Sequence, residues 1–213
     1  IYETDFADDD PTGIEINITG GNYSGEVYSE NVKGFVKAGA FDTDLDDSYI
    51  AADTVFYEQD GVTGVGEEYV ASAGAVAYVG NKAYGTLQAA IDEANAGDTV
   101  TLLGNVTENI VIDSGDKITL DLNGKTITNA GGHTIEVKSG GELTVNGTGT
   151  VTNVTKGKAT ILNNGTATLN GGTYNRSTGI EYYVIDNNKG NMTINSGVTV
   201  ECSNPGSSLI RNG

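Results

Sequence analysis

The first residues that could do chemistry are acidic and closely spaced. Asp42, Asp44 and Asp46 have the alternating spacing with which a calcium-binding loop begins, and Asp53 stands at the twelfth position. Position six is Asp47 rather than the glycine that an EF-hand turn requires, and no helical pattern flanks the segment. We therefore expect no resident cofactor. Calcium at Asp42, Asp44 and Asp46 is kept as a hypothesis in which the ion pins a loop.

A second group of candidates is aromatic. Tyr174, Tyr182 and Tyr183 flank a polar stretch at residues 175–178 that also contains Arg176. Loops that leave a rigid scaffold often carry binding function, and tyrosine rings could form a platform for a sugar. We predict Tyr174, Arg176 and Tyr182 as ligand-binding residues. Tyr183 falls at a core position of the repeat described below, so we expect it to pack inside.

Paired carboxylates, which a glycoside hydrolase needs, are scarce in the repeat region. Only Glu136 and Asp186 share a register there, and they lie two repeats apart. His133 stands in a glycine-rich turn and is expected to be a solvated surface residue. Arg176 and Arg211 show no acidic partner at a recurring spacing. The sequence therefore predicts no catalytic residue.

These residues belong to a repeat of about 24 residues. Four segments alternate apolar residues with threonine and then reach an Asn/Gly turn; they begin at Ile118, Leu143, Ala167 and Met192, spaced by 25, 24 and 25 residues. Alternation with a period of two predicts a strand with one buried face. Asn and Gly tolerate the positive φ of a tight turn. A second set of strands lies between the first and begins at Thr134, Thr160 and Tyr183.

A period this short, with at least two strands and no helix, excludes propellers, ankyrin and HEAT repeats. We predict an all-β fold, a right-handed parallel β-helix with about 24 residues per coil, in which each coil stacks on the next. Asparagines at the turns are expected to stack as ladders.

One short α-helix is predicted near residues 86–96. Thr86 is a suitable N-cap and Gly97 a suitable residue after the helix end. The open end of a β-helix exposes apolar side chains and strand edges, so this helix is expected to cover the N-terminal end. Its apolar positions, spaced for one helix face, are Leu87, Ala90, Ile91 and Ala94.

Acidic residues are concentrated in the first third of the chain. Residues 1–70 contain 17 of the 29 acidic residues and 2 of the 11 basic ones. We therefore expect two domains. Residues 1–70 would be the final coils of a preceding β-helix module. Residues 71–213 would be a capping strand and helix followed by a parallel β-helix that is truncated at its C-terminal end.

The composition of the 213 residues excludes several classes of function. A net charge of −18 argues against nucleic-acid binding, which needs a basic face. No run of 18 apolar residues is present, so we expect no membrane insertion. The single cysteine excludes a disulfide framework. An acidic chain rich in Gly, Asn and Thr is typical of secreted bacterial surface proteins.

Residues 76–103, followed by Ile118-Thr-Leu-Asp-Leu-Asn-Gly-Lys-Thr-Ile127, resemble the opening of pectin-lyase-like right-handed β-helix modules in large surface proteins of gut Firmicutes. The resemblance implies an extracellular, cell-surface location. It also implies adhesion to host or microbial glycans or to another surface protein, and further modules in the same polypeptide.

Taken together, the sequence favours a non-catalytic structural and adhesive β-helix segment of a larger bacterial surface protein. Two alternatives stay open. One is a fragment of a polysaccharide lyase or glycoside hydrolase. The other is a fibre or decoration protein of a bacteriophage.

Overall fold

The computed structural model describes residues 2–3, 16–30, 32–52, 54–60, 67–80, 82–177, 182–203 and 208–213. The chain divides into two compact units, Ile1–Ala75 and Val76–Gly213. The division falls five residues after the boundary expected from the charge distribution. Each unit has its own hydrophobic core.

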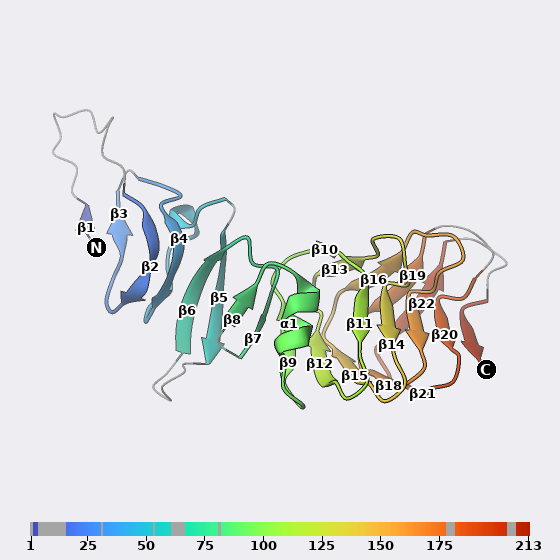
Figure 1. Cartoon of the computed structure of the whole chain (residues 1–213). Helices are drawn as coiled ribbons and strands as arrows, with labels where there is room; N and C mark the ends of the chain where they lie inside the picture. Colours follow the sequence, from blue (N-terminus) through green and yellow to red (C-terminus); the bar gives the residue numbers. More distant parts are fainter. Residues whose placement is uncertain are drawn as a thin grey trace. The chain divides into compact units, whose positions relative to one another are not determined.

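The second unit is a parallel β-solenoid with three faces, and each coil adds one strand to each face (Figure 1). The β9 sheet contains β9 (Thr99–Leu102), β12 (Lys117–Asp121), β15 (Glu142–Asn146), β18 (Thr166–Leu169) and β21 (Asn191–Ile194). The β10 sheet contains β10 (Val106–Thr107), β13 (Thr126–Thr128), β16 (Thr150–Asn153), β19 (Thr173–Arg176) and β22 (Thr199–Cys202). The β11 sheet contains β11 (Ile110–Ile112), β14 (Ile135–Val137), β17 (Ile161–Asn163), β20 (Ile185–Asn187) and β23 (Ile210–Asn212).

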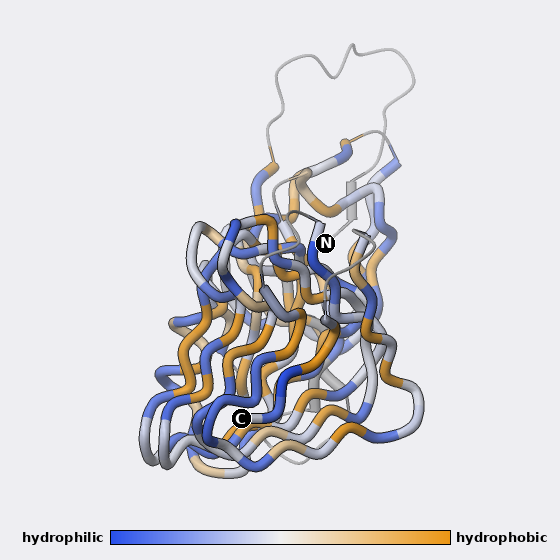
Figure 2. Tube along the Cα trace, turned by 90° about the vertical axis from the view of Figure 1, so that its right-hand side faces the viewer, coloured by the Kyte–Doolittle hydropathy of each residue, from blue (hydrophilic) through white to orange (hydrophobic). Residues whose placement is uncertain are grey.

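The register of the strands confirms the predicted repeat. Ile118 pairs with Leu143, Leu143 with Ala167, and Ala167 with Met192. In β12 and β15 alternate residues are buried, so the apolar positions stack inside while threonines and charged residues face outward. Figure 2 shows this alternation as hydrophobic positions that recur from coil to coil. The predicted parallel β-helix is therefore the fold of this unit, with a third strand in each coil besides the two that the pattern indicated.

Asparagine ladders join the coils, as the turns predicted. On the outer surface, at the end of the β9 sheet, Asn170 donates to Asn146 at 2.8 Å and Asn195 donates to Asn170 at 2.7 Å. A second ladder lies inside the solenoid at the end of the β11 sheet; its members are Asn163, Asn187 and Asn212. Burial is tolerated there because each amide finds a partner in the next coil.

The N-terminal end of the solenoid is covered by a helix and a hairpin. The helix α1 (Leu87–Glu93) is capped by Thr86, whose hydroxyl accepts a hydrogen bond from Ala89 N. It is shorter than the predicted 86–96, because the backbone becomes extended at Ala94. The antiparallel strands β7 (Ala77–Val79) and β8 (Lys82–Tyr84) extend the β9 sheet.

Gln88 covers the edge of the β11 sheet. Its side-chain oxygen accepts from Val111 N at 2.8 Å, and its amide nitrogen donates to Val111 O at 3.0 Å. The side chain thus supplies the two hydrogen bonds that a neighbouring strand would make. The helix was expected to cover the apolar core at this end, and through Gln88 it also covers the backbone of the edge strand β11.

The first unit combines parallel and antiparallel pairing. Its four-stranded sheet has the order β2 (Ile18–Tyr23), β4 (Val36–Phe41), β6 (Glu67–Ala73) and β5 (Thr54–Asp60). The pairs β2–β4 and β1 (Tyr2–Glu3)–β3 (Tyr28–Ser29) are parallel, as stacked coils would be. The hairpin β5–β6 is antiparallel and was not predicted. A short 3₁₀ helix, η1 (Asp47–Tyr49), follows β4.

Candidate functional site

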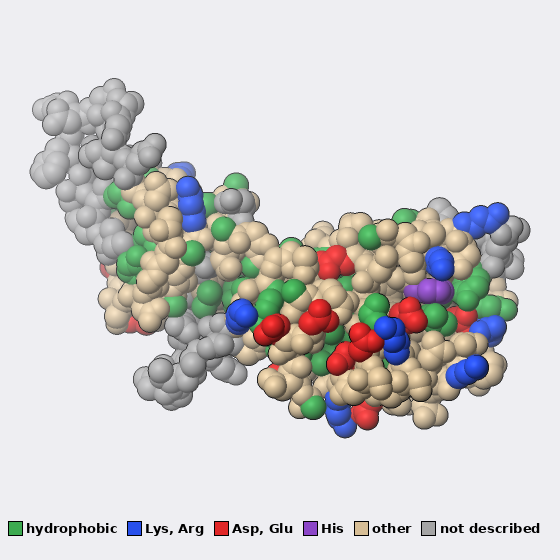
Figure 3. Space-filling view, in the orientation of Figure 1, with side chains coloured by type: hydrophobic (Ala, Val, Ile, Leu, Met, Phe, Trp, Pro, Cys, Tyr) green, Lys and Arg blue, Asp and Glu red, His purple; other side chains and the backbone are tan. Residues whose placement is uncertain are grey.

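The outer face of the β11 sheet carries a row of residues in register. Glu136 pairs with Leu162, Leu162 with Asp186, and Asp186 with Arg211. Each is the middle residue of a three-residue strand whose flanking residues point inward, so the row faces away from the core. In Figure 3, acidic, basic and histidine side chains gather over the part of the solenoid where Figure 1 labels β11, β14 and β20.

Asp186 is the centre of the cluster. Its side chain is 1% exposed, and its two oxygens have different partners. Arg211 Nε donates to Oδ1 at 2.7 Å, and the Tyr182 hydroxyl donates to Oδ2 at 2.8 Å. Asp186 in turn raises the pKa of the Arg211 guanidinium through this hydrogen bond. Burial, followed by the hydrogen bond to Asp186, raises the pKa of Tyr182.

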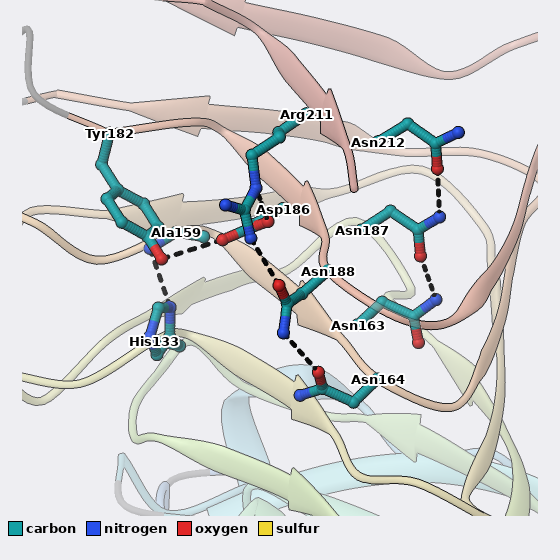
Figure 4. Close-up of polar contacts among 10 residues, drawn as sticks. All are labelled: His133, Ala159, Asn163, Asn164, Tyr182, Asp186, Asn187, Asn188, Arg211 and Asn212. Carbon is teal, nitrogen blue, oxygen red and sulfur yellow. Dashed lines mark hydrogen bonds and ion pairs between the residues drawn. The ribbon is translucent and has the colours of Figure 1, made fainter.

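Three rings form a continuous aromatic surface beside this ion pair. The ring centroids of His133 and Tyr182 lie 5.9 Å apart, and those of Tyr182 and Tyr183 lie 5.5 Å apart. The Arg211 guanidinium stands over the Tyr183 ring at 5.4 Å. All three residues are half-buried. We refer to His133, Tyr182, Tyr183, Asp186 and Arg211 as the β11-sheet cluster; Figure 4 shows its members other than Tyr183.

His133 is held as a neutral ring. Its Nδ1 accepts a hydrogen bond from Ala159 N at 2.9 Å, which requires an unprotonated nitrogen at that position. Burial, together with the nearby Lys158, lowers the pKa of His133 below its usual value. The residue was expected to be solvated; the structure instead places it as a packed member of the cluster.

A chain of amides extends the cluster toward the next corner of the solenoid. Arg211 Nη2 donates to Asn188 Oδ1 at 2.6 Å, and Asn188 Nδ2 donates to Asn164 Oδ1 at 3.0 Å (Figure 4). The contacts cross three successive coils. These contacts fix the geometry around Asp186, because Tyr182, Arg211 and Asn188 are all held in one hydrogen-bonded network.

Of the three predicted ligand-binding residues, only Tyr182 lies in this cluster. Tyr174 is fully buried in the hydrophobic core, and burial raises the pKa of its hydroxyl. It occupies an inward position of β19, so it packs in the interior and offers no platform. Tyr183 was expected inside but lies in the outer cluster, just before β20. The predicted alignment placed Val184 beside Ile161, whereas Ile185 pairs with Ile161 in the structure.

Arg176 is also fully buried, so the prediction that it contacts a ligand does not agree with its position. Its Nη1 donates to the backbone oxygen of Tyr182 at 2.7 Å, and its Nη2 donates to Thr155 O at 3.3 Å. Burial lowers its pKa. Arg176 therefore fixes the backbone from which Tyr182 projects.

The acidic candidates for calcium serve separate turns. Asp42 accepts hydrogen bonds from Ser24 and Gly25, Asp46 accepts one from Ser48 N, and Asp44 accepts one from Leu45 N. These hydrogen bonds lower the pKa of Asp42 and Asp46. Within the described residues, no three His, Cys, Asp or Glu side chains form a group that could hold a metal. Asp53 lies outside those residues, so the calcium hypothesis stays a prediction.

Sequence reasoning missed Arg211 as part of the site. The signal was present, because Asp186 and Arg211 are 25 residues apart and that is the length of one coil. The predicted register of Glu136 with Asp186, two coils apart, is confirmed.

Comparison with protein-family models, with curated proteins and with solved structures finds no match to this chain. In the part of the chain that the structure describes, no helix has the length and apolarity to cross a membrane.

Proposed function

We propose that this protein is a non-catalytic, extracellular β-solenoid module of a bacterial surface protein, and that the β11-sheet cluster contacts carbohydrate. The observation that carries the proposal is the continuous surface of three rings, His133, Tyr182 and Tyr183, beside a buried ion pair. Flat ring faces next to hydrogen-bonding groups suit a ligand whose own surface alternates C–H faces and hydroxyls.

The rigidity of the cluster supports a binding role. Asp186 fixes both Tyr182 and Arg211, and Arg176 holds the backbone of Tyr182 from within the solenoid. A surface that is ordered before the ligand arrives loses less conformational entropy on binding. The solenoid then acts as a stiff support that displays this surface, while the acidic exterior favours solubility.

A glycan-array screen of the whole chain, followed by calorimetric titration of the best binder, tests the proposal. Tyr183→Leu removes the flat ring beneath Arg211 but keeps apolar volume. We expect this variant to bind about tenfold more weakly. Repeating the screen with calcium and with a chelator tests the separate hypothesis of calcium at Asp42, Asp44 and Asp46.

Tyr84→Leu is the matched control. Tyr84 also has a cation over its ring, since Lys82 Nζ lies 4.8 Å from the centroid, and it belongs to the same unit. Absence of any bound glycan, or an equal loss of affinity in the two variants, would contradict a binding role for the cluster.

A second candidate function, glycoside hydrolysis, is favoured by Glu136 and Asp186. They lie in register two strands apart, which at the usual strand spacing means roughly 9.5 Å between their backbones. If both side chains leave the sheet in parallel, their carboxyl groups keep about this separation, which is at the upper end of the roughly 6.5–9.5 Å found in inverting glycosidases. Release of reducing ends from a polysaccharide panel, abolished by Glu136→Gln, would favour this activity. Binding without turnover would favour the non-catalytic module.

A further inference from the structure

Unequal turn lengths create a notch at the corner between the β11 and β9 sheets. The turns there span residues 113–116, 138–141, 164–165 and 188–190 in successive coils, so the third turn is the shortest. Gly165 allows this, because a Cβ on it would meet the backbone oxygens of Gly141 and Lys138. The resulting notch of about 520 Å³ is lined by Ser114, Lys138, Ser139, Asn164 and Lys189.

Every side chain that lines the notch can donate a hydrogen bond. Of the described residues that line it, two are lysines from the turns on either side of the short one, two are serines, and none is a carboxylate. Asn164 Oδ1 already accepts from Asn188, which leaves the Asn164 amide nitrogen as the group available to a ligand. In a protein with a net charge of −18, such a lining is a local exception.

The two lysines differ in how far they are neutralised. Lys138 Nζ lies 2.7 Å from Asp113 Oδ1, and this contact raises the pKa of the lysine. Lys189 has no carboxylate within ion-pair distance among the described residues, and it is exposed. The positive potential of the notch therefore comes chiefly from Lys189, with Asp113 acting against it.

The type of donor favours a tetrahedral anion. An arginine fork matches the planar carboxylate in a bidentate way, whereas a lysine ammonium acts as a compact point charge with rotatable donors. Lysine, hydroxyl and amide groups that approach from several coils suit oxygens that point in several directions. The hydrogen-bonded chain Arg211–Asn188–Asn164 links this notch to the β11-sheet cluster.

We propose that the notch binds a sulfate ester on the carbohydrate that the β11-sheet cluster contacts. The inference rests on the proposed function and names the class of ligand, a sulfated glycan. A carboxylated sugar and free inorganic anions are the competing sources of negative charge, and the experiment separates them.

The test compares chondroitin sulfate oligosaccharide with its desulfated form, which keeps the carboxylates, by calorimetry on the whole chain. We expect the sulfated form to bind about tenfold more tightly. Lys189→Gln should bring the two affinities together without changing the affinity for the desulfated form. Asp113→Asn, which frees Lys138, should strengthen binding of the sulfated form.

Lys125→Gln is the control for total charge, because it removes one lysine at a different corner of the solenoid. Equal binding of the two oligosaccharides would overturn the proposal, as would equal effects of Lys125→Gln and Lys189→Gln.

A titration with inorganic sulfate and with inorganic phosphate distinguishes failure of the notch from failure of the proposed function. Its readout is the change in the NMR chemical shifts of Lys189 and Asn164. Shifts of these residues without any glycan binding would support an anion notch and contradict carbohydrate binding by the cluster. No shift with either anion, together with no preference for the sulfated oligosaccharide, would overturn the notch alone.

Discussion

Asp186 is buried, and each of its two side-chain oxygens accepts a hydrogen bond, one from Arg211 and one from Tyr182. Asp186→Asn keeps the shape of the side chain but removes the negative charge that Arg211 contacts. The asparagine can also turn an amide N–H toward the guanidinium. Since a buried charged hydrogen bond contributes more than a neutral one, we expect the free energy of unfolding to fall by about 1–3 kcal/mol. Urea denaturation measures this difference.

Glu201→Gln is the control for Asp186→Asn, because it removes one negative charge from an exposed residue. It should leave stability nearly unchanged. Equal losses in the two variants would mean that the ion pair with Arg211 contributes nothing beyond general charge effects.

His133 gives the protein a pH dependence whose sign follows from its lowered pKa. In the unfolded chain His133 has its ordinary pKa of 6.5, while the folded chain binds the proton only at lower pH. Between these two pKa values the unfolded state binds more protons than the folded state. The contribution of neutral His133 to the free energy of unfolding is therefore fully present above pH 6.5 and falls as the pH drops toward the folded pKa. Unfolding free energies of wild type and His133→Gln, measured above and below 6.5, should therefore converge at the acidic end. A constant difference between the two proteins would contradict this account.

At the scale of elements, the edge of the β11 sheet depends on one side chain. Gln88→Ala improves helix propensity in α1 but removes both hydrogen bonds to Val111. We expect a net loss of about 1–2 kcal/mol and faster hydrogen exchange at the Val111 amide. Gln88→Glu keeps an acceptor for Val111 N and loses the donor to Val111 O, so its effect should be intermediate in exchange rate. Unchanged exchange in Gln88→Ala would show that the edge needs no cover.

The strands of the solenoid could be predicted because their signal is local and repeated. Ile118, Leu143 and Ala167 alternate with threonines, and a period-two pattern at a constant spacing leaves few ways to bury the apolar face. Thr86 at the start of α1 is equally local. The register of Glu136 with Asp186 followed from the same count of residues per coil.

Which residues belong to the candidate site was harder to predict, because membership depends on which face of its strand each side chain occupies. Tyr174 and Arg176 are alternate residues of β19, so both turn inward together. Tyr183 moved outward because the register of β20 differs by one residue from the expected one, and such a shift reverses which face a side chain occupies. The notch depends on turn length, which a search for repeated motifs does not weigh.

At the scale of the whole molecule, charge is distributed unequally between two units with separate cores. The core of the first unit is built around Phe35, Phe41 and Tyr49, while the second unit has a larger core that runs through its coils. Residues 1–70 contain 17 acidic residues and only 2 basic ones. We therefore expect two unfolding transitions, with the smaller and more acidic unit melting first.

Salt should move these two transitions by different amounts. Like charges repel in the compact state, and raising the ionic strength from about 0.01 M to about 0.15 M shortens the Debye length from roughly 30 Å to roughly 8 Å. The melting temperature of the first unit should rise more than that of the second in a calorimetric scan with NaCl. Calcium chloride at equal ionic strength then separates screening from specific binding. An equal shift means screening alone, whereas a further rise of the first transition would place a calcium ion among the aspartates of that unit. A first transition that does not respond to NaCl would show that its acidic residues are too far apart to repel one another.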